Sequence, residues 1–179
     1  MEPCVAVKDA SVLIDLANGD LIGHWFSLGI QTIITDSVRL EISMGKQDAI
    51  ISPFIDAGLI QIDRVEDADA LGWLTTVASL SEQHLISFAD ATALLCAKQR
   101  GALLLTGDGR LRREASGHGV TVRGVLWILD LLVSREVLNC EKAVNALDAI
   151  LSEGGRLPEA ECQKRRRRWG EGKWIETGA

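Results

Sequence analysis

The chain has 179 residues, a length that suits one domain with a well-buried core. Hydrophobic residues make up 47% of it, and no apolar run reaches the roughly 20 residues that a membrane-spanning helix needs. The formal net charge of −6 divides into +3 from Arg156 onward and −9 before it, which is not the profile of a simple basic nucleic-acid binder. An acidic body with a basic end suits a protein that gathers carboxylates around cations and offers a separate segment to phosphates.

The cysteines and the N-terminal residues indicate the cellular compartment. The four cysteines lie far apart and form no Cys-x-x-Cys pair, so a thiolate zinc site is not expected. The first ten residues lack the basic start and long apolar core of a signal peptide. We therefore expect reduced thiols, no membrane association and a cytoplasmic location.

Strand and helix patterns alternate along the chain. Short apolar or β-branched runs predict strands at residues 4–8, 31–35, 59–63, 102–105 and 120–122. Helical spacing predicts a short helix or turn at 21–28 and helices at 10–17, 37–43, 47–57, 66–80, 87–100, 109–116, 124–134, 141–153 and 158–169. Asp36 is expected to cap the helix at 37–43, and Pro53 to make the next helix irregular. The pattern predicts an α/β fold, a three-layer α/β/α arrangement with a central, mostly parallel sheet.

Four acidic residues lie where a strand ends or near the start of a helix. Asp9 follows the first strand directly, and Asp108 lies in the turn after residues 102–105. Glu41 and Asp90 lie in the helices at 37–43 and 87–100. Ligands of open α/β sheets bind beyond the carboxyl ends of the strands, so the four side chains are expected to converge there.

Asp90 is the most informative of the four acids. Its neighbours on one helix face are Ala93, Leu94 and Ala97, so it heads an apolar stripe, where a carboxylate is costly unless it is paired or binds a metal. Each acid also has a structural interpretation. Asp9 could lie in a turn before a helix, and Glu41 could be a solvated surface residue. Asp90 could form a capping box with Ser87, and Asp108 could be a turn residue. Two further acids are interpreted as structural, namely Asp15 and Asp36.

Taken together, the segments around these acids resemble the PIN-domain family. The similar segments are KDASVLIDL, TDSVRLEI, SFADATALLCAK, LLLTGDGRLRREA and GVTVRGVLWILDLLV. The resemblance covers roughly residues 5–133 and is closer to the longer stand-alone PIN proteins of bacteria and archaea than to the compact VapC-type toxins. It divides the chain into a PIN-like nuclease domain at 1–155 and a basic C-terminal helix and tail at 156–179, which we expect to belong to the same unit.

The resemblance implies a metal-dependent endoribonuclease. The implied catalytic and metal-binding residues are Asp9, Glu41, Asp90 and Asp108. Hard carboxylate ligands suit Mg²⁺ or Mn²⁺, and two such ions about 3.5–4 Å apart could promote hydrolysis of an RNA phosphodiester. The three aspartates would be direct or water-mediated ligands, and Glu41 would hold a water molecule or the second ion. Thr106 would hydrogen-bond a carboxylate or the scissile phosphate.

Substrate and protein partners follow from the same resemblance. RNA is the expected substrate, and further candidates for contact with it are Thr106, Arg110, Arg165 and Arg166. The basic run at 164–168 cannot lie on one helix face, so part of it must be solvated. Tryptophans near this run could stack on bases or pack on the body, namely Trp169 and Trp174. A toxin role would add an antitoxin protein as a partner, and a homodimer is also considered.

Two other functions remain as alternatives. The first is a catalytically silent PIN fold that binds RNA or serves in assembly, against which stands the presence of all four acids. The second is a phosphatase or phosphoryl-acceptor domain, which lacks its Asp-x-Asp motif because Ser11 lies two residues after Asp9. The three histidines show no ligand spacing and are interpreted as structural or solvent-facing.

Overall fold

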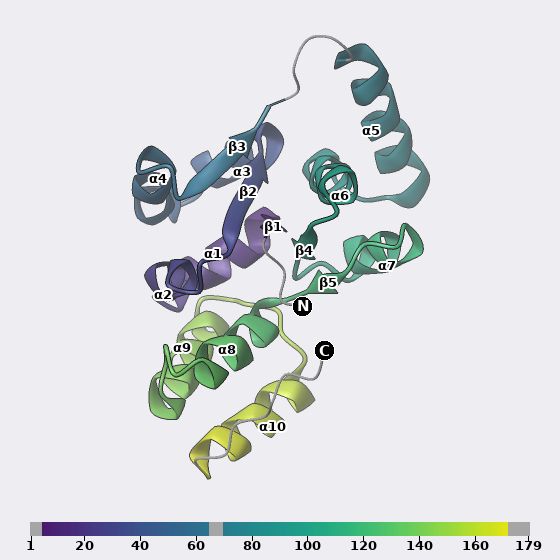
Figure 1. Cartoon of the computed structure of the whole chain (residues 1–179). Helices are drawn as coiled ribbons and strands as arrows, with labels where there is room; N and C mark the ends of the chain where they lie inside the picture. Colours follow the sequence, from purple (N-terminus) through teal and green to yellow (C-terminus); the bar gives the residue numbers. More distant parts are fainter. Residues whose placement is uncertain (1–4, 65–69, 172–179) are drawn as a thin grey trace.

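A single parallel sheet organises the chain (Figure 1). The computed structural model describes residues 5–64 and 70–171. Its strands are β1 (Val5–Lys8), β2 (Gln31–Thr35), β3 (Ile60–Asp63), β4 (Leu103–Leu105) and β5 (Val122–Arg123). They pair in the order β3-β2-β1-β4-β5, and every pair is parallel. The prediction of an α/β fold around a parallel sheet is confirmed.

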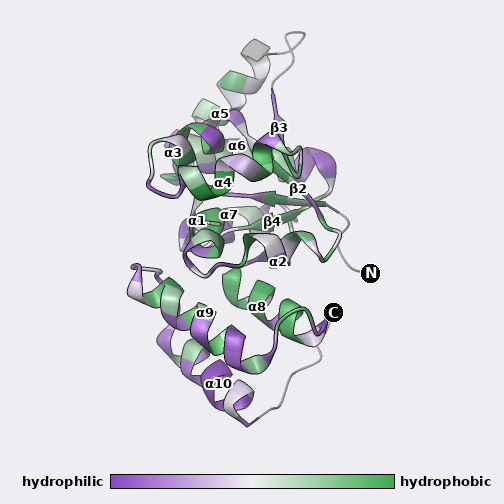
Figure 2. Cartoon of the chain, turned by 90° about the vertical axis from the view of Figure 1, so that its left-hand side faces the viewer, coloured by the Kyte–Doolittle hydropathy of each residue, from purple (hydrophilic) through white to green (hydrophobic). Residues whose placement is uncertain are grey.

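Helices flank this sheet. They are α1 (Ala10–Asn18), α2 (Ile22–Phe26), α3 (Asp36–Ser43), α4 (Asp48–Asp56), α5 (Ala70–His84), α6 (Phe88–Arg100), α7 (Gly109–Gly117), α8 (Val125–Ser134), α9 (Cys140–Ser152) and α10 (Glu159–Gly170). Figure 2 shows α3, α4 and α6 on one side of the sheet and α2 and α8 on the other, with α9 and α10 farther from the sheet. The apolar surfaces of both sides of the sheet are therefore covered, as a parallel sheet requires.

The central strands are buried, and α6 lies over them. Val7 of β1 and Leu104 of β4 are fully buried. Helix α6 packs against β1, β2 and β4. It begins at a capping box in which Ser87 is the N-cap residue, and it ends at Gly101, whose φ of 58° is left-handed and suits glycine. These local signals set the residue at which α6 begins, and the packing of α6 on the strands then places Asp90 beside the sheet.

A few boundaries differ from the sequence prediction. Helix α3 is capped by Thr35, whose Oγ1 accepts a hydrogen bond from the backbone of Val38, so the prediction of an Asp36 cap is wrong and Asp36 is the first helical residue. Helix α4 continues through Pro53 to Asp56. Helix α5 ends at His84, beyond the predicted end at residue 80, and residues 66–69 of that prediction lie outside the described residues.

The C-terminal helices extend one side of the molecule. Helix α9 packs against α1 and α8, and α10 packs against α9. Helix α10 is thus separated from the sheet by another layer, as Figure 2 shows. Within the described ranges, no helix combines the length and apolar character needed to cross a membrane.

Candidate active site

Two of the four acids lie at the same edge of the sheet. Asp9 follows β1 immediately, and its backbone N–H donates to the carbonyl of Leu105 at 3.1 Å. Asp108 follows β4 after a two-residue turn and is the N-cap of α7. Because β1 and β4 are neighbouring parallel strands, with Lys8 opposite Leu105, both aspartates lie beyond their carboxyl ends. This is the edge at which α/β sheets bind ligands.

Asp9 is almost fully buried and held by three donors. Its Oδ1 accepts hydrogen bonds from Ser11 Oγ at 2.7 Å and from the backbone of Val12 at 3.1 Å. Its Oδ2 accepts a hydrogen bond from Thr106 Oγ1. Burial raises the pKa of Asp9, the three hydrogen bonds act in the opposite direction, and the charge of Asp90 raises the pKa further. The side chain is therefore fixed in orientation by neutral donors.

Thr106 connects the two strand-end aspartates. Its hydroxyl donates to Asp9 and also accepts a hydrogen bond from the backbone of Asp108 at 2.9 Å. Asp108 Oδ1 in turn accepts from the backbones of Arg110 at 2.7 Å and Leu111 at 2.8 Å, which caps α7. Asp108 Oδ2 accepts no hydrogen bond from the residues that the structure describes, so the cap orients the carboxylate and leaves one oxygen for a ligand.

Asp90 combines the structural and the electrostatic features that the sequence suggested. Ser87 N donates to Asp90 Oδ2 at 3.2 Å, and Asp90 N donates to Ser87 Oγ at 2.9 Å, which completes a capping box. Burial raises the pKa of Asp90, and the charge of Asp108 raises it further. A capping role for one carboxylate oxygen thus coexists with proximity to another acid.

Glu41 joins the other acids through its charge. It lies on α3 and is exposed, unlike its buried neighbour Ile42. The pKa of Glu41 is raised by desolvation first and then by the charges of Asp90 and Asp9. We call the four residues Asp9, Glu41, Asp90 and Asp108 the acidic cluster. Each is linked to at least one of the others by charge repulsion that raises a pKa.

The donor chemistry of the acidic cluster suits a hard divalent cation. Its side chains offer carboxylate oxygen only, which Mg²⁺ and Mn²⁺ prefer. Among the residues that the structure describes, no three His, Cys, Asp or Glu side chains come together closely enough to bind a metal ion as a group. An ion at this cluster would accordingly use fewer direct protein ligands, with water completing its coordination, as is usual for Mg²⁺.

The lysine next to Asp9 does not form an ion pair with it. Lys8 is fully buried, and its Nζ lies 3.5 Å from the centroid of the Trp25 ring. This Nζ has no hydrogen-bond partner among the described residues, and burial lowers the pKa of Lys8 well below 10.5. The charge of Asp9 is therefore not matched by a hydrogen-bonded cation, which leaves it able to bind a metal ion.

The sequence analysis did not identify Ser11 as a candidate, whereas the structure shows it hydrogen-bonded to Asp9 of the acidic cluster. Ser11 Oγ donates to Asp9 Oδ1 and accepts from the backbone of Gly107 at 3.1 Å. It thus ties the start of α1 to the turn after β4. A signal for this role was present in the sequence. Ser11 lies two residues after the acidic N-cap Asp9, a spacing at which a short hydroxyl side chain can hydrogen-bond the capping carboxylate.

Asp15 is a further buried carboxylate behind the acidic cluster. Its residue is 9% exposed, and burial raises its pKa from 3.8 to about 6, with a smaller contribution from the charge of Asp9. The folded protein therefore keeps this proton up to about pH 6, whereas the unfolded chain releases it near pH 4. Between these values the free energy of unfolding decreases as the pH rises.

We expect Asp15→Asn to increase the free energy of unfolding at pH 7.5 by up to about 2 kcal/mol, because the amide removes a buried charge. The gain should shrink as the pH is lowered toward 4.5, where Asp15 is protonated in the folded protein. Urea unfolding in chelator at several pH values measures it. Asp56→Asn, which changes an exposed acid, is the control and should show no such trend. A gain of the same size at every pH would contradict the titration.

The arginines of the basic run are engaged with the protein itself. Arg165 donates to Asp130 Oδ2 from Nε at 2.9 Å and from Nη2 at 2.6 Å, and it also pairs with Glu161 at 2.8 Å. Arg166 pairs with Asp148 of α9. Both side chains thus hold α10 against α8 and α9, and we leave them out of the proposed RNA site. Trp169 is buried against the body, and Trp174 lies outside the described residues.

Arg110 and the three histidines interact with groups outside the acidic cluster. Arg110 is exposed next to Asp108, and its Nη1 donates to the carbonyl of Leu85 at 3.2 Å. His84 lies 2.8 Å from a carboxylate oxygen of Glu114. His24 and His118 contact Asp20 and Lys98, respectively. Within the described residues, no histidine forms a hydrogen bond or an ion pair with the acidic cluster.

Comparisons with known proteins agree with the fold. The family model DUF3368, described as a PIN domain, matches residues 5–171. The crystal structure of PAE2754 from Pyrobaculum aerophilum is similar, with 21% sequence identity and a TM-score of 0.50. The match covers 72% of this chain and 96% of that one, and at this identity it shows a shared fold. No curated protein matches the sequence.

Proposed function

The chain belongs to the PIN-domain family, and from this premise we propose that it is a metal-dependent endoribonuclease acting at the acidic cluster. The observation that carries the proposal is the charge coupling among four carboxylates, of which Asp9 and Asp108 lie at the carboxyl ends of β1 and β4. Carboxylates close enough to repel one another are an unfavourable arrangement unless a cation joins them. Their collection in one place therefore supports a site for chemistry.

Asp9, Asp90 and Asp108 would hold the cation, with Glu41 at the exposed side of the cluster. When bound, Mg²⁺ or Mn²⁺ supplies positive charge to the phosphodiester and promotes ionisation of water. For Asp90 and Asp108, one oxygen is engaged in a helix cap, so their other oxygens are the ones oriented toward a ligand. Thr106 and Ser11 keep Asp9 in place by donating to its two oxygens.

The protein side chains favour hydrolysis by water. Attack by the 2′-hydroxyl of RNA would need an acid and a base such as histidine at the scissile bond. The histidines that the structure describes interact with the Asp20 carbonyl, Lys98 and Glu114 and not with the acidic cluster. Attack by water instead leaves a 5′-phosphate and a 3′-hydroxyl.

Cleavage of single-stranded RNA tests this proposal. We expect cleavage with Mg²⁺ or Mn²⁺, none with a chelator, and little with Ca²⁺, whose looser coordination positions water poorly. End-group analysis should find 5′-phosphates and 3′-hydroxyls. Cyclic phosphates, or cleavage that persists with chelator, would contradict the mechanism. RNA binding without cleavage under any of these ions would support the silent RNA-binding module instead.

A toxin role, an antitoxin and a homodimer stay predictions from the sequence. The genomic neighbourhood is the simplest observation that bears on them. A small upstream gene for a DNA-binding protein would support the toxin–antitoxin arrangement.

A further inference from the structure

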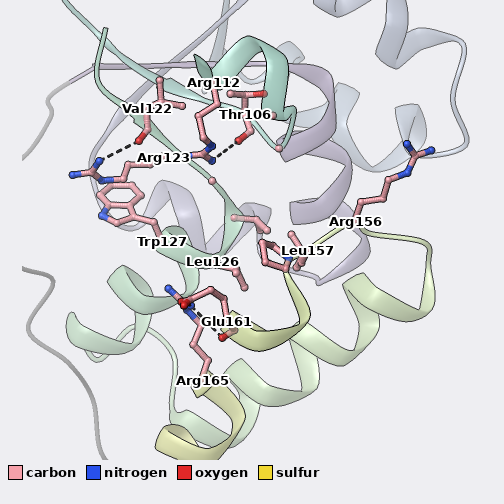
Figure 3. Close-up of a pocket in the computed structure, with 15 residues that line it drawn as sticks. Thr106, Arg112, Val122, Arg123, Leu126, Trp127, Arg156, Leu157, Glu161 and Arg165 are labelled. Carbon is pink, nitrogen blue, oxygen red and sulfur yellow. Dashed lines mark hydrogen bonds and ion pairs between the residues drawn. The ribbon is translucent and has the colours of Figure 1, made fainter. Parts of the chain in front are cut away.

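A cavity of about 440 Å³ lies beside the acidic cluster, between the ends of β4 and β5 and the start of α10 (Figure 3). Thr106 belongs to both places. Its hydroxyl binds Asp9, whereas its carbonyl accepts a hydrogen bond from Arg112 Nη2 at 3.0 Å in the wall of the cavity. Thr106 therefore borders both the acidic cluster and the cavity.

The cavity is positively charged although the body of the protein is acidic. Two of its lining residues, Arg112 and Arg123, form no ion pair with a carboxylate within the described part of the chain, whereas the side chain of Arg156 points away from the cavity in Figure 3. The acid that also lines it, Glu161, is matched by Arg165 at 2.8 Å. An unmatched positive cavity next to an acidic cluster suits a polyanion whose backbone passes from one to the other.

An aromatic ring stands among these cations. Trp127, near the start of α8, is partly buried and lies beside Arg123 in Figure 3. A tryptophan ring at the edge of a cationic cavity can stack on a nucleobase of any sequence. Guanidinium groups and one aromatic surface in a cavity of this size match a single nucleotide.

The glycine at the base of the cavity gives Arg112 its position. A Cβ atom built on Gly124 would lie 3.0 Å from Arg112 Nη2 and 3.3 Å from the Thr106 carbonyl oxygen. A side chain there would push against the guanidinium and the carbonyl that it binds. The absence of a side chain lets Arg112 reach across and present its remaining donors.

The C-terminal segment forms the opposite wall. Leu157, Pro158 and Glu161 line the cavity, and Arg165 anchors this part of α10 to Asp130. The C-terminal helix, which the resemblance in the sequence did not cover, therefore completes the cavity.

We propose that this cavity binds one nucleotide of a single-stranded RNA, next to the phosphodiester at the acidic cluster. Arg112 and Arg123 contact its phosphate groups, and Trp127 stacks on its base. This inference rests on the proposed ribonuclease function and assigns it a substrate subsite. The occupant is a flexible single strand, because a base within a duplex is already stacked and cannot lie on the ring.

Binding of a fluorescent single-stranded RNA of mixed sequence to the full chain tests the subsite, at low salt and with chelator so that no cleavage occurs. Arg123→Gln should weaken binding several-fold and reduce the slope of log K against log [salt] by about 0.7, the value for one phosphate contact on a single strand. Trp127→Leu should weaken binding about ten-fold and leave the salt slope unchanged, because stacking releases no counterions. Arg167→Gln removes the same charge from the exposed surface of α10 and is the matched control.

The outcomes separate this inference from the nuclease proposal. Cavity variants that bind like the wild type, or like Arg167→Gln, would overturn the subsite even if the wild type cleaves RNA with Mg²⁺. A loss of binding in the cavity variants would support it even if the wild type cleaves nothing. Equal losses on double-stranded RNA, with no effect of Trp127→Leu, would overturn nucleotide binding in favour of a general phosphate contact. Thermal unfolding of each variant verifies that it is folded.

Discussion

Asp90→Asn is expected to lower the rate of RNA cleavage by roughly 10³-fold or more while the protein keeps its fold. The loss follows because a charge that would hold the cation and stabilise the transition state is removed. The fold is retained because an amide oxygen can still accept the hydrogen bond that Ser87 N now donates to Asp90 Oδ2. Less repulsion from Asp108 should keep or raise the free energy of unfolding in metal-free buffer.

A second variant at the same position separates charge from capping. Asp90→Ala removes both, so it should also abolish cleavage but cost about 1 kcal/mol of stability through the lost cap. Asp56→Asn, an exposed change of the same kind, should leave cleavage unchanged. The measurements are initial rates with Mg²⁺ and urea unfolding with chelator. A marked destabilisation by Asn with activity retained would assign Asp90 to the helix cap alone.

Arg165→Gln is expected to reduce the free energy of unfolding by about 3 kcal/mol, the cost of leaving one partner of a buried ion pair alone. The side chains of Arg165 and Asp130 are only 14% and 11% exposed, and they share two hydrogen bonds, of 2.9 and 2.6 Å. Burial raises the pKa of Asp130, and Arg165 acts against this, so loss of the arginine leaves a carboxylate that is costly to keep charged.

A double substitution measures the interaction energy between Arg165 and Asp130. Asp130→Asn combined with Arg165→Gln should be less destabilising than the sum of the single changes, because no unpaired charge remains. Arg167→Gln, on the exposed side of the same helix, should change stability by less than about 0.5 kcal/mol. Urea unfolding measures all four proteins. Equal effects of Arg165→Gln and Arg167→Gln would mean that the pair does not fasten α10.

Local signals in the sequence determined the elements and therefore the fold class. The capping box at Ser87 and the left-handed Gly101 delimit α6 from within the segment itself. The β-branched run Gln31–Thr35 is observed with its predicted bounds. Where two residues could cap, as at Thr35 and Asp36, the sequence left a one-residue ambiguity, because both side chains are good acceptors.

The family and its four acids also followed from the sequence, because each acid has a position relative to a strand end or a helix start. A strand that ends at Lys8 places Asp9 at the edge of any parallel sheet. Their electrostatic coupling, however, depends on β1 and β4 being neighbours, which is a non-local pairing. Their assignment as metal ligands stays a prediction that the variants above test.

Only the tertiary structure decided how the basic end is used. The sequence shows five cations in a row, and nothing local states that Arg165 meets Asp130, 35 residues earlier, or that Arg166 meets Asp148. The cavity is likewise lined by residues of β5, α8 and α10. Helix α9 brings these elements together because it packs against α8 and α10. Caps and periodicities are encoded by neighbours in the chain, whereas ion pairs and cavities arise from contacts between distant segments, so only the folded chain shows which arginines remain available for RNA.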